Sequence, residues 1–138
     1  EAFFVPEKGL YKSFMLKEEH FSELTNSLLI LAGAAKGKRA DDILDRLAQS
    51  ENGMITISVS HSIFKYEALF TRGERYADCI LREVEERFLK MLREGATSFW
   101  ETDLGSEDFD RAGSLCHGWS SVPIYVFEKL GICKRAFS

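Results

Sequence analysis

Two kinds of helix alternate along this sequence, and the alternation limits the possible folds more than any other feature. Three segments, 23–35, 63–70 and 122–130, have apolar side chains on most faces, which is typical of buried helices. Between them, 39–48 and 74–94 each have one apolar stripe opposite a charged face, which is typical of half-exposed helices. Short connections make consecutive helices antiparallel neighbours. The pattern predicts an all-α fold in which inner and outer helices alternate.

Local signals indicate the ends and the buried faces of these helices. Ser22 is a suitable N-cap for the first helix, and glycines follow four of them, at Gly37, Gly73, Gly95 and Gly131. The stripe of the second helix is Ala40, Ile43, Leu44, Leu47 and Ala48. The stripe of the fourth is Ala77, Leu81, Val84, Phe88, Met91 and Leu92. In the first helix we expect a shared apolar face at Leu24, Leu28, Leu31 and Ala35.

Turns and short extended stretches separate the helices. Residues 2–16 are expected to form a hairpin or an irregular entry, with a turn at 7–9. Residues 54–60 alternate apolar and polar side chains, which predicts an extended stretch. Residues 102–118 have no clear periodicity and are expected to form a loop. The whole chain, 1–138, is interpreted as one domain.

Composition excludes several classes of function. The 138 residues are 45% hydrophobic and 29% charged, which suits one globular domain with a core. The formal net charge is −4 and no basic stripe is present, so nucleic acid is not an expected partner. No apolar run approaches the ~20 residues that span a bilayer, so no membrane partner is expected. Cys79, Cys116 and Cys133 cannot all pair with one another, which favours free thiols and the cytoplasm.

Two motifs at the edges of the predicted loop carry the groups best suited to chemistry or ligand recognition. They are 95–101 (GATSFWE), after a long charged helix, and 114–120 (SLCHGWS), before a short apolar one. Polar groups on a loop between rigid elements are a frequent site of function. The candidate residues are Glu101, His117, Trp100 and Trp119, with His61 and Tyr66 from the start of the helix at 63–70.

Each candidate also has an ordinary structural interpretation. Glu101 could be a surface or cap-like glutamate, His117 a satisfied structural histidine, and Trp100 and Trp119 core residues. Glu23, in the first turn of its helix, would be stabilised by the helix dipole. A metal site is not expected, because the adjacent Cys116 and His117 lack zinc-ligand spacing. The same pair is a poor nucleophile and base, since neighbouring side chains in an extended segment point apart.

Four stretches give the chain a resemblance to a known family. They are 4–11 (FVPEKGLY), 19–26 (EHFSELTN) with Ala32-Gly33, 62–69 (SIFKYEAL), and the pair GATSFWE and SLCHGWS followed by an apolar helix. In this order they resemble the C-terminal part of the catalytic domain of α-L-rhamnosidase-like glycoside hydrolases, the six-hairpin (α/α)6-barrel glycosidases. The resemblance covers nearly the whole chain.

The resemblance implies a fold and a reaction. The family has twelve barrel helices, whereas about five are predicted here, so a partial (α/α)6 toroid is expected. The earlier hairpins and the general acid would then lie outside this chain. The implied reaction is inverting hydrolysis, with Glu101 as the general base that activates water and with no cofactor. His117, Trp119, Trp100, Tyr66 and His61 would bind the sugar.

A second class of function remains open. Without its general acid the chain alone would be incomplete and inactive, which favours a non-catalytic helical module that binds carbohydrate or another subunit. An incomplete toroid would also expose apolar sides of its inner helices. We therefore expect a carbohydrate ligand, together with either the remainder of the barrel or a second copy as partner.

Overall fold

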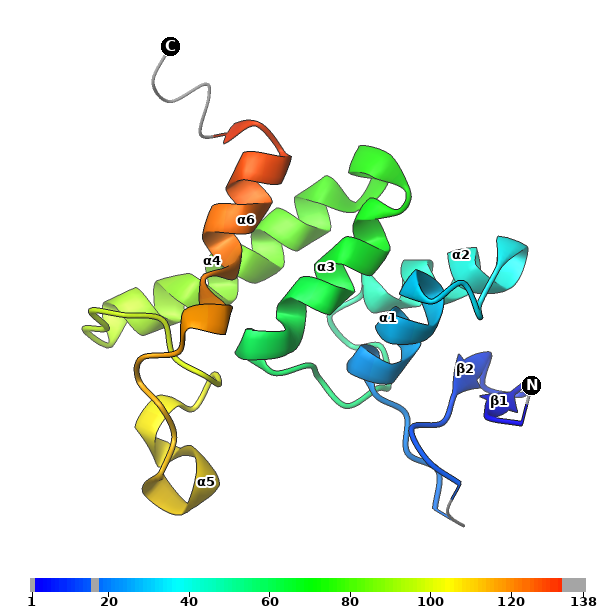
Figure 1. The fold of residues 1–138 in the computed structure, drawn as a ribbon, viewed down its shortest axis with the longest axis horizontal. Coiled ribbons are helices and arrows are strands. Elements are labelled where there is room, and N and C mark those ends of the chain that lie inside the picture. Colours follow the sequence, from blue (N-terminus) through cyan, green and yellow to red (C-terminus); the bar gives the residue numbers. More distant parts are fainter. Residues whose placement is uncertain (1, 16–17, 133–138) are drawn as a thin grey trace. The chain divides into compact units, whose positions relative to one another are not determined.

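The computed structural model describes residues 2–15 and 18–132, which are mostly helical and include one pair of short antiparallel strands (Figure 1). The all-α prediction agrees with this content. The chain divides into two compact units. The first unit comprises Glu1–Ile57 and Phe64–Tyr76, and the second unit comprises Ser58–Ile63 and Ala77–Ser138.

The first unit begins with the predicted hairpin. Strands β1 (Phe4–Val5) and β2 (Leu10–Tyr11) pair antiparallel, with Phe4 opposite Tyr11. The turn between them is closed by the Gly9 amide, which donates to the carbonyl of Val5 at 2.9 Å. Gly9 has a φ of +67°, a backbone conformation that favours glycine, so the turn prediction is confirmed.

Helix α1 (Glu23–Leu31) begins where the sequence predicts but buries a different face. The Ser22 hydroxyl accepts a hydrogen bond from the Thr25 amide at 3.1 Å, which confirms the N-cap. The buried residues are Glu23, Asn26, Ser27 and Ile30. Leu28 and Leu31 are 41% and 39% exposed, so the expected apolar buried face is wrong.

Polar contacts explain why α1 turns this face inward. The Asn26 side chain accepts a hydrogen bond from the Tyr11 amide at 3.0 Å and donates to the Tyr11 carbonyl at 3.1 Å. The side chain of Asn26 thus makes the two hydrogen bonds to Tyr11 that a further strand beside β2 would otherwise make. Because buried backbone groups need partners, these bonds hold Asn26 inward against the apolar preference of the helix.

A buried ion pair lies beside Asn26 in the first unit. Glu23 Oε1 accepts from Lys65 Nζ at 2.7 Å and from Asn52 Nδ2 at 2.6 Å, and Oε2 accepts from the Ile57 amide at 2.9 Å. Both charged side chains are almost fully buried. The Glu23 carboxylate is therefore stabilised by three specific hydrogen-bond partners in addition to the helix dipole. The network joins α1, the 52–57 segment and α3 (Ser62–Phe70).

Helix α2 (Gly37–Leu47) follows its predicted amphipathic pattern. Its buried residues are Ala40, Ile43, Leu44 and Leu47, as the stripe predicts. On the outer face Asp41 pairs with Arg72 at 2.7 Å, and Asp45 pairs with Arg75 at 2.8 Å. Gly37 begins this helix instead of ending α1, which the sequence analysis had expected.

The 3₁₀ turn η2 (Gly73–Tyr76) ends the first unit and is held to α2. Burial raises the pKa of Tyr76 to about 12, and its hydrogen bond to Asp45 at 2.7 Å contributes to the increase. The predicted helix at 74–94 thus begins with this 3₁₀ turn, and its α-helical part starts only at Ala77.

The predicted extended stretch at 54–60 has little regular structure. Residues Ser22 and Ile55 form one isolated parallel bridge. Val59–His61 then form the 3₁₀ turn η1, which belongs to the second unit and precedes α3. The stretch does not pair as a strand because its amides have other partners. The Ile57 amide, for example, donates to the Glu23 side chain.

The second unit is built on α4 (Ala77–Arg93) and α6 (Val122–Lys129), which pack against each other (Figure 1). Gly95, with a φ of +81°, ends α4 as predicted. The α4 stripe is confirmed at Val84, Phe88 and Met91, but Leu92 is exposed and Ile80 takes a buried place. In α6, Ile124 is 61% exposed, so the expected burial on most faces is wrong.

Two further expectations concern membranes and thiols. Within the described part of the chain, no helix has the length and apolar character needed to cross a bilayer. Among the described residues, neither Cys79 nor Cys116 is part of a disulfide, and Cys133 lies outside the described residues.

We expect the Lys65→Met variant to lower the free energy of unfolding of the chain by about 3–5 kcal/mol. The substitution leaves the Glu23 carboxylate buried without its counter-ion, and removing one partner of a buried pair costs about this much. Urea denaturation followed by circular dichroism measures the change.

The matched control is Lys38→Met. Lys38 pairs with Asp42 at 2.7 Å, but both side chains are mostly exposed and screened by water, so the free energy of unfolding should change far less than in Lys65→Met. Equal losses in the two variants would contradict a dominant role for the buried pair.

Candidate functional site

The two sequence motifs lie side by side in the second unit. The Glu101 amide donates to the Ser114 carbonyl at 3.0 Å, and the His117 amide donates to the Phe99 carbonyl at 2.8 Å. The Ser98 hydroxyl adds a bond to the Leu115 carbonyl. The segments 98–101 and 114–117 thus pair through their main chains, which brings the two motifs together.

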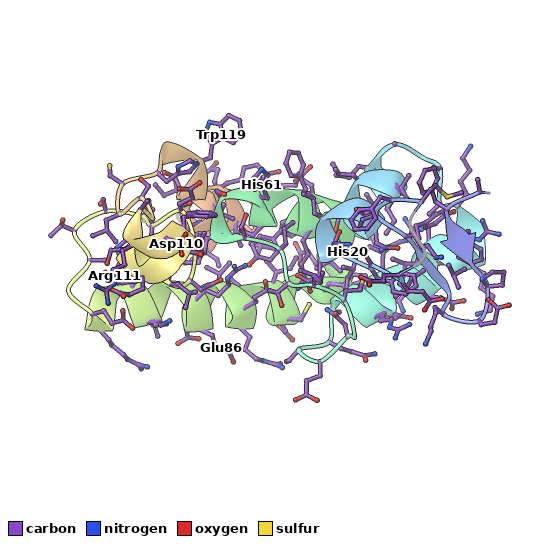
Figure 2. The ribbon with its side chains drawn as sticks, turned by 90° about the horizontal axis from the view of Figure 1, so that it is seen from below. His20, His61, Glu86, Asp110, Arg111 and Trp119 are labelled. Atoms are coloured by element: carbon purple, nitrogen blue, oxygen red, sulfur yellow. The ribbon has the colours of Figure 1, made fainter. Side chains whose placement is uncertain are left out.

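The turn η1 joins this pair from an earlier part of the sequence. The Ser60 amide donates to the Glu101 carbonyl at 3.2 Å, and η1 packs against η4 (Gly118–Ser120). Figure 2 shows His61 and Trp119 on one side of the second unit, whereas Glu86 projects from α4 on the other side. Five predicted site residues therefore belong to one compact unit: His61, Trp100, Glu101, His117 and Trp119.

Two glycines close the loop between the motifs. A methyl group added at Gly113 would come within 1.9 Å of the Gly105 carbonyl oxygen, so the two backbones are in direct contact. A methyl group at Gly105 would come within 2.7 Å of the Trp100 ring. Trp100 is buried against this contact, which agrees with the core-packing interpretation of that residue.

Helix α4 anchors the beginning of the same loop. Arg87 binds both carboxylate oxygens of Asp103, with its Nε at 2.8 Å from Oδ1. Lys90 donates to the Asp103 carbonyl at 2.8 Å. Because Asp103 lies two residues after Glu101, these bonds tie the candidate carboxylate to the longest helix. Sequence spacing could not indicate this contact, since the partners are 16 residues apart.

The tip of the loop has an unusual backbone. Phe109, Asp110 and Arg111 have φ values of 51°, 56° and 70°, so the short element α5 (Asp108–Arg111) is largely a left-handed turn. Such conformations are unfavourable for residues other than glycine. Asp108 accepts hydrogen bonds at its carbonyl from Ala112 and Gly113, both at 3.0 Å, which closes the turn.

The polar side chains of Glu101 and His117 are available to a ligand. Both side chains are half-buried, and no hydrogen bond or ion pair with the described residues involves either polar group. The His117 ring meets the Trp119 ring edge-on, with centroids 6.4 Å apart. Trp119 is 73% exposed. A carboxylate, an imidazole and an exposed indole are suitable for binding water and a sugar ring.

Tyr66 differs from the other candidates. It lies on α3 in the first unit, and its side chain is fully buried. Its predicted role in lining a sugar site stays a prediction. In the part of the chain that the structure describes, no three His, Cys, Asp or Glu side chains are grouped as metal ligands would be.

One of the comparisons with known proteins finds a similar structure, and it is a glycoside hydrolase. The sequence matches no protein-family model and no curated protein. Among solved structures, however, the chain is similar to a GH78 family rhamnosidase of Bacillus sp. GL1. The two are 28% identical and superpose with a TM-score of 0.79. The match covers 92% of this chain but 14% of that chain, so the similarity is to a short part of the rhamnosidase.

We expect the Gly113→Ala variant to lower the free energy of unfolding by about 1–3 kcal/mol, the usual cost of overpacking. The new methyl group would collide with the Gly105 backbone, which cannot rotate away as a side chain can. Urea unfolding followed by tryptophan fluorescence measures the change, since Trp100 lies on this contact.

Gly118→Ala is the matched control, because a methyl group there meets no atom within 4 Å. Neither glycine has a positive φ, so the two variants differ in the collision alone. The free energy of unfolding of this control should stay within about 0.5 kcal/mol of that of the parent chain. A Gly113→Ala variant as stable as the control would rule out the close contact.

Proposed function

We propose that the chain is part of an inverting glycoside hydrolase that cleaves α-L-rhamnosides. The observation that carries this proposal is the paired placement of Glu101 and His117, whose polar groups have no partner among the described residues. The similarity to a solved rhamnosidase over 92% of the chain supports the choice of reaction class.

Glu101 would act as the general base on water. Inverting glycosidases use one carboxylate to activate water and a second carboxyl group to protonate the leaving oxygen. Glu101 suits the first role because its segment is fixed while its carboxylate stays open. Two main-chain hydrogen bonds hold it, from the Glu101 amide to the Ser114 carbonyl and from the Ser60 amide to the Glu101 carbonyl. The side-chain contact of Arg87 with Asp103 holds the segment two residues further on. A positioned base needs both properties.

His117 and Trp119 would form part of the sugar subsite. An imidazole can exchange hydrogen bonds with sugar hydroxyl groups, and an indole can cover the apolar face of a deoxy sugar. The edge-on contact of the two rings holds them as one surface. His61, on the neighbouring turn, would add a further polar contact.

The second carboxyl group would come from outside this chain. The chain corresponds to 14% of the solved rhamnosidase, and we propose that further helical hairpins complete an (α/α)6 toroid around the site. The exposed Leu28 and Leu31 of α1 and Ile124 of α6 would then contact these hairpins. No cofactor is needed for the reaction.

In a polypeptide that contains this chain and hydrolyses 4-nitrophenyl α-L-rhamnoside, Glu101→Gln should lower kcat by about 10²- to 10⁴-fold. This is the typical contribution of a positioned acid or base. The release of 4-nitrophenol measures the rate. A loss below tenfold would remove Glu101 from the role of base, and an intact polypeptide that leaves aryl α-L-rhamnosides uncleaved would contradict the substrate class.

Glu107→Gln is the control for this experiment. Glu107 lies on the same loop, but its side chain is mostly exposed and contacts Arg111 at 3.6 Å. A large loss of kcat in this variant as well would point to a general effect of loop charge.

The alternative is a non-catalytic helical module that binds carbohydrate or another subunit. An apolar groove of about 710 Å³ favours it, lined by α4, the 96–99 segment and α6 within the second unit. The aromatic residues that line it are Phe88, Phe99 and Phe127. Such an open apolar surface is typical of a place where another helix packs.

The isolated chain distinguishes the two functions. If the module interpretation holds, methyl α-L-rhamnoside should bind the chain alone and shift the fluorescence of the exposed Trp119, and Trp119→Ala should abolish the shift. Sedimentation over a range of concentrations would show association. A monomeric chain that binds no rhamnoside would contradict the module and leave the hydrolase proposal in place.

A further inference from the structure

The dipeptide Asn52-Gly53 lies against the buried carboxylate of Glu23 in the first unit. The Asn52 residue is 6% exposed. Its Nδ2 donates to Glu23 Oε1 at 2.6 Å and to the Gln49 carbonyl at 3.2 Å. Its Oδ1 accepts a hydrogen bond from the Met54 amide at 2.9 Å, which forms an Asx turn. The nitrogen and the oxygen of this carboxamide are therefore both held by the fold.

The same dipeptide is chemically reactive. Asparagine is a thermolabile residue. Because Gly53 has no side chain, its amide nitrogen can approach the Asn52 carboxamide carbon without steric hindrance. The Arg46 guanidinium also donates to the main-chain carbonyl of Asn52 at 2.8 Å. A cation on that oxygen draws electrons from the peptide group and favours loss of the proton from the Gly53 amide. The turn thus combines a reactive dipeptide with a group that promotes its reaction.

We propose that Asn52 is a site of self-modification by loss of ammonia, which the hydrogen bonds of its carboxamide suppress while the first unit is folded. In the reaction the Gly53 nitrogen loses its proton to water and bonds to Asn52 Cγ. The bond between Cγ and Nδ2 breaks, and this nitrogen takes a proton from water and leaves as ammonia. Addition of water to the resulting cyclic imide then gives aspartate or isoaspartate at position 52. No atom is oxidised or reduced.

The fold suppresses the reaction through its restraints on the carboxamide. When the Gly53 nitrogen bonds to Cγ, this planar carbon becomes tetrahedral, which moves Nδ2 and Oδ1 away from their partners. The hydrogen bonds to Glu23 and Met54 then weaken inside the protein, where a polar group without a partner is costly. Modification therefore requires the 52–57 segment to open, and its rate follows the population of the open state.

The product is incompatible with the ion pair that the parent side chain supports. In the folded arrangement a carboxylate oxygen would replace Nδ2, 2.6 Å from Glu23 Oε1. Two anionic acceptors would then face each other beside Lys65, which already pairs with Glu23. A buried charge without compensation is strongly destabilising. An opening that lasts long enough for modification is therefore converted from a reversible event into a permanent loss of the first unit.

The test is the rate at which residue 52 loses ammonia at mildly alkaline pH, measured by tandem mass spectrometry of the peptide that contains it. The chain is incubated folded in buffer and unfolded in urea. We expect the folded chain to react at least about tenfold more slowly, because opening limits the rate. Equal rates in the two samples would overturn the proposal.

Two variants separate the network around Glu23 from stability in general. Lys65→Met removes the counter-ion of Glu23 and leaves the dipeptide unchanged, so we expect it to accelerate the loss of ammonia in buffer by at least about tenfold. Gly113→Ala destabilises the second unit and should leave the rate unchanged. Equal acceleration in both variants, or none in Lys65→Met, would contradict the role of the network.

Asn52→Asp tests the consequence of modification, since it supplies the aspartate product directly. Asn52→Ala is its matched control, because it removes the same hydrogen bonds without adding a charge. We expect the urea midpoint of unfolding, followed by circular dichroism at neutral pH, to be lower in Asn52→Asp than in Asn52→Ala. A midpoint in Asn52→Asp equal to or above that of Asn52→Ala would contradict the permanent loss, whereas the rates above decide the modification itself.

Discussion

The ion pair between Glu23 and Lys65 is the interaction on which the first unit depends. Two charges that are almost fully buried cannot be tolerated separately, since the effective cost of removing each from water is several kcal/mol. The pair persists because Asn52 and the Ile57 amide satisfy the remaining carboxylate positions. Three segments far apart in sequence must therefore meet for any of them to be stable. The ion pair specifies the arrangement more than it adds to the total stability.

The second unit uses a different principle. Its site segments are held by main-chain hydrogen bonds between 98–101 and 114–117 and by direct backbone contact between Gly105 and Gly113. Main-chain bonds leave side chains uncommitted. Glu101 and His117 are therefore rigidly placed while their polar groups remain open to water or a ligand. Such a division between supporting backbone and uncommitted side chains is suitable for a binding or catalytic site.

Much of the helical layout could be predicted from the sequence, because helix ends and stripes are local properties. The buried stripe of α2, the Ser22 cap and the end of α4 at Gly95 are examples. Where the prediction was wrong, a partner distant in sequence decides the outcome. Leu28 turns outward because Asn26 and Glu23 are held inward by Tyr11 and Lys65, and no periodicity of α1 contains that information.

For the candidate site, the sequence could provide the two motifs and the loop between them, and the structure adds the main-chain bonds that pair the two segments. The roles of Glu101 and His117 stay predictions. The Asp103 clamp was missed because its partners are distant in sequence. The left-handed residues 109–111 include no glycine, so the usual signal of a positive φ was absent.

The contact between Gly105 and Gly113 has a consequence for how such a protein can diverge. It divides the loop into a closed base, which includes Trp100 and adjoins Glu101, and a tip formed by residues 106–112. Changes of sequence or length in the tip need not disturb the base, because the two glycine backbones already close the loop beneath it. The tip could therefore diverge in sequence and length while the paired segments that hold Glu101 and His117 keep one unchanged arrangement.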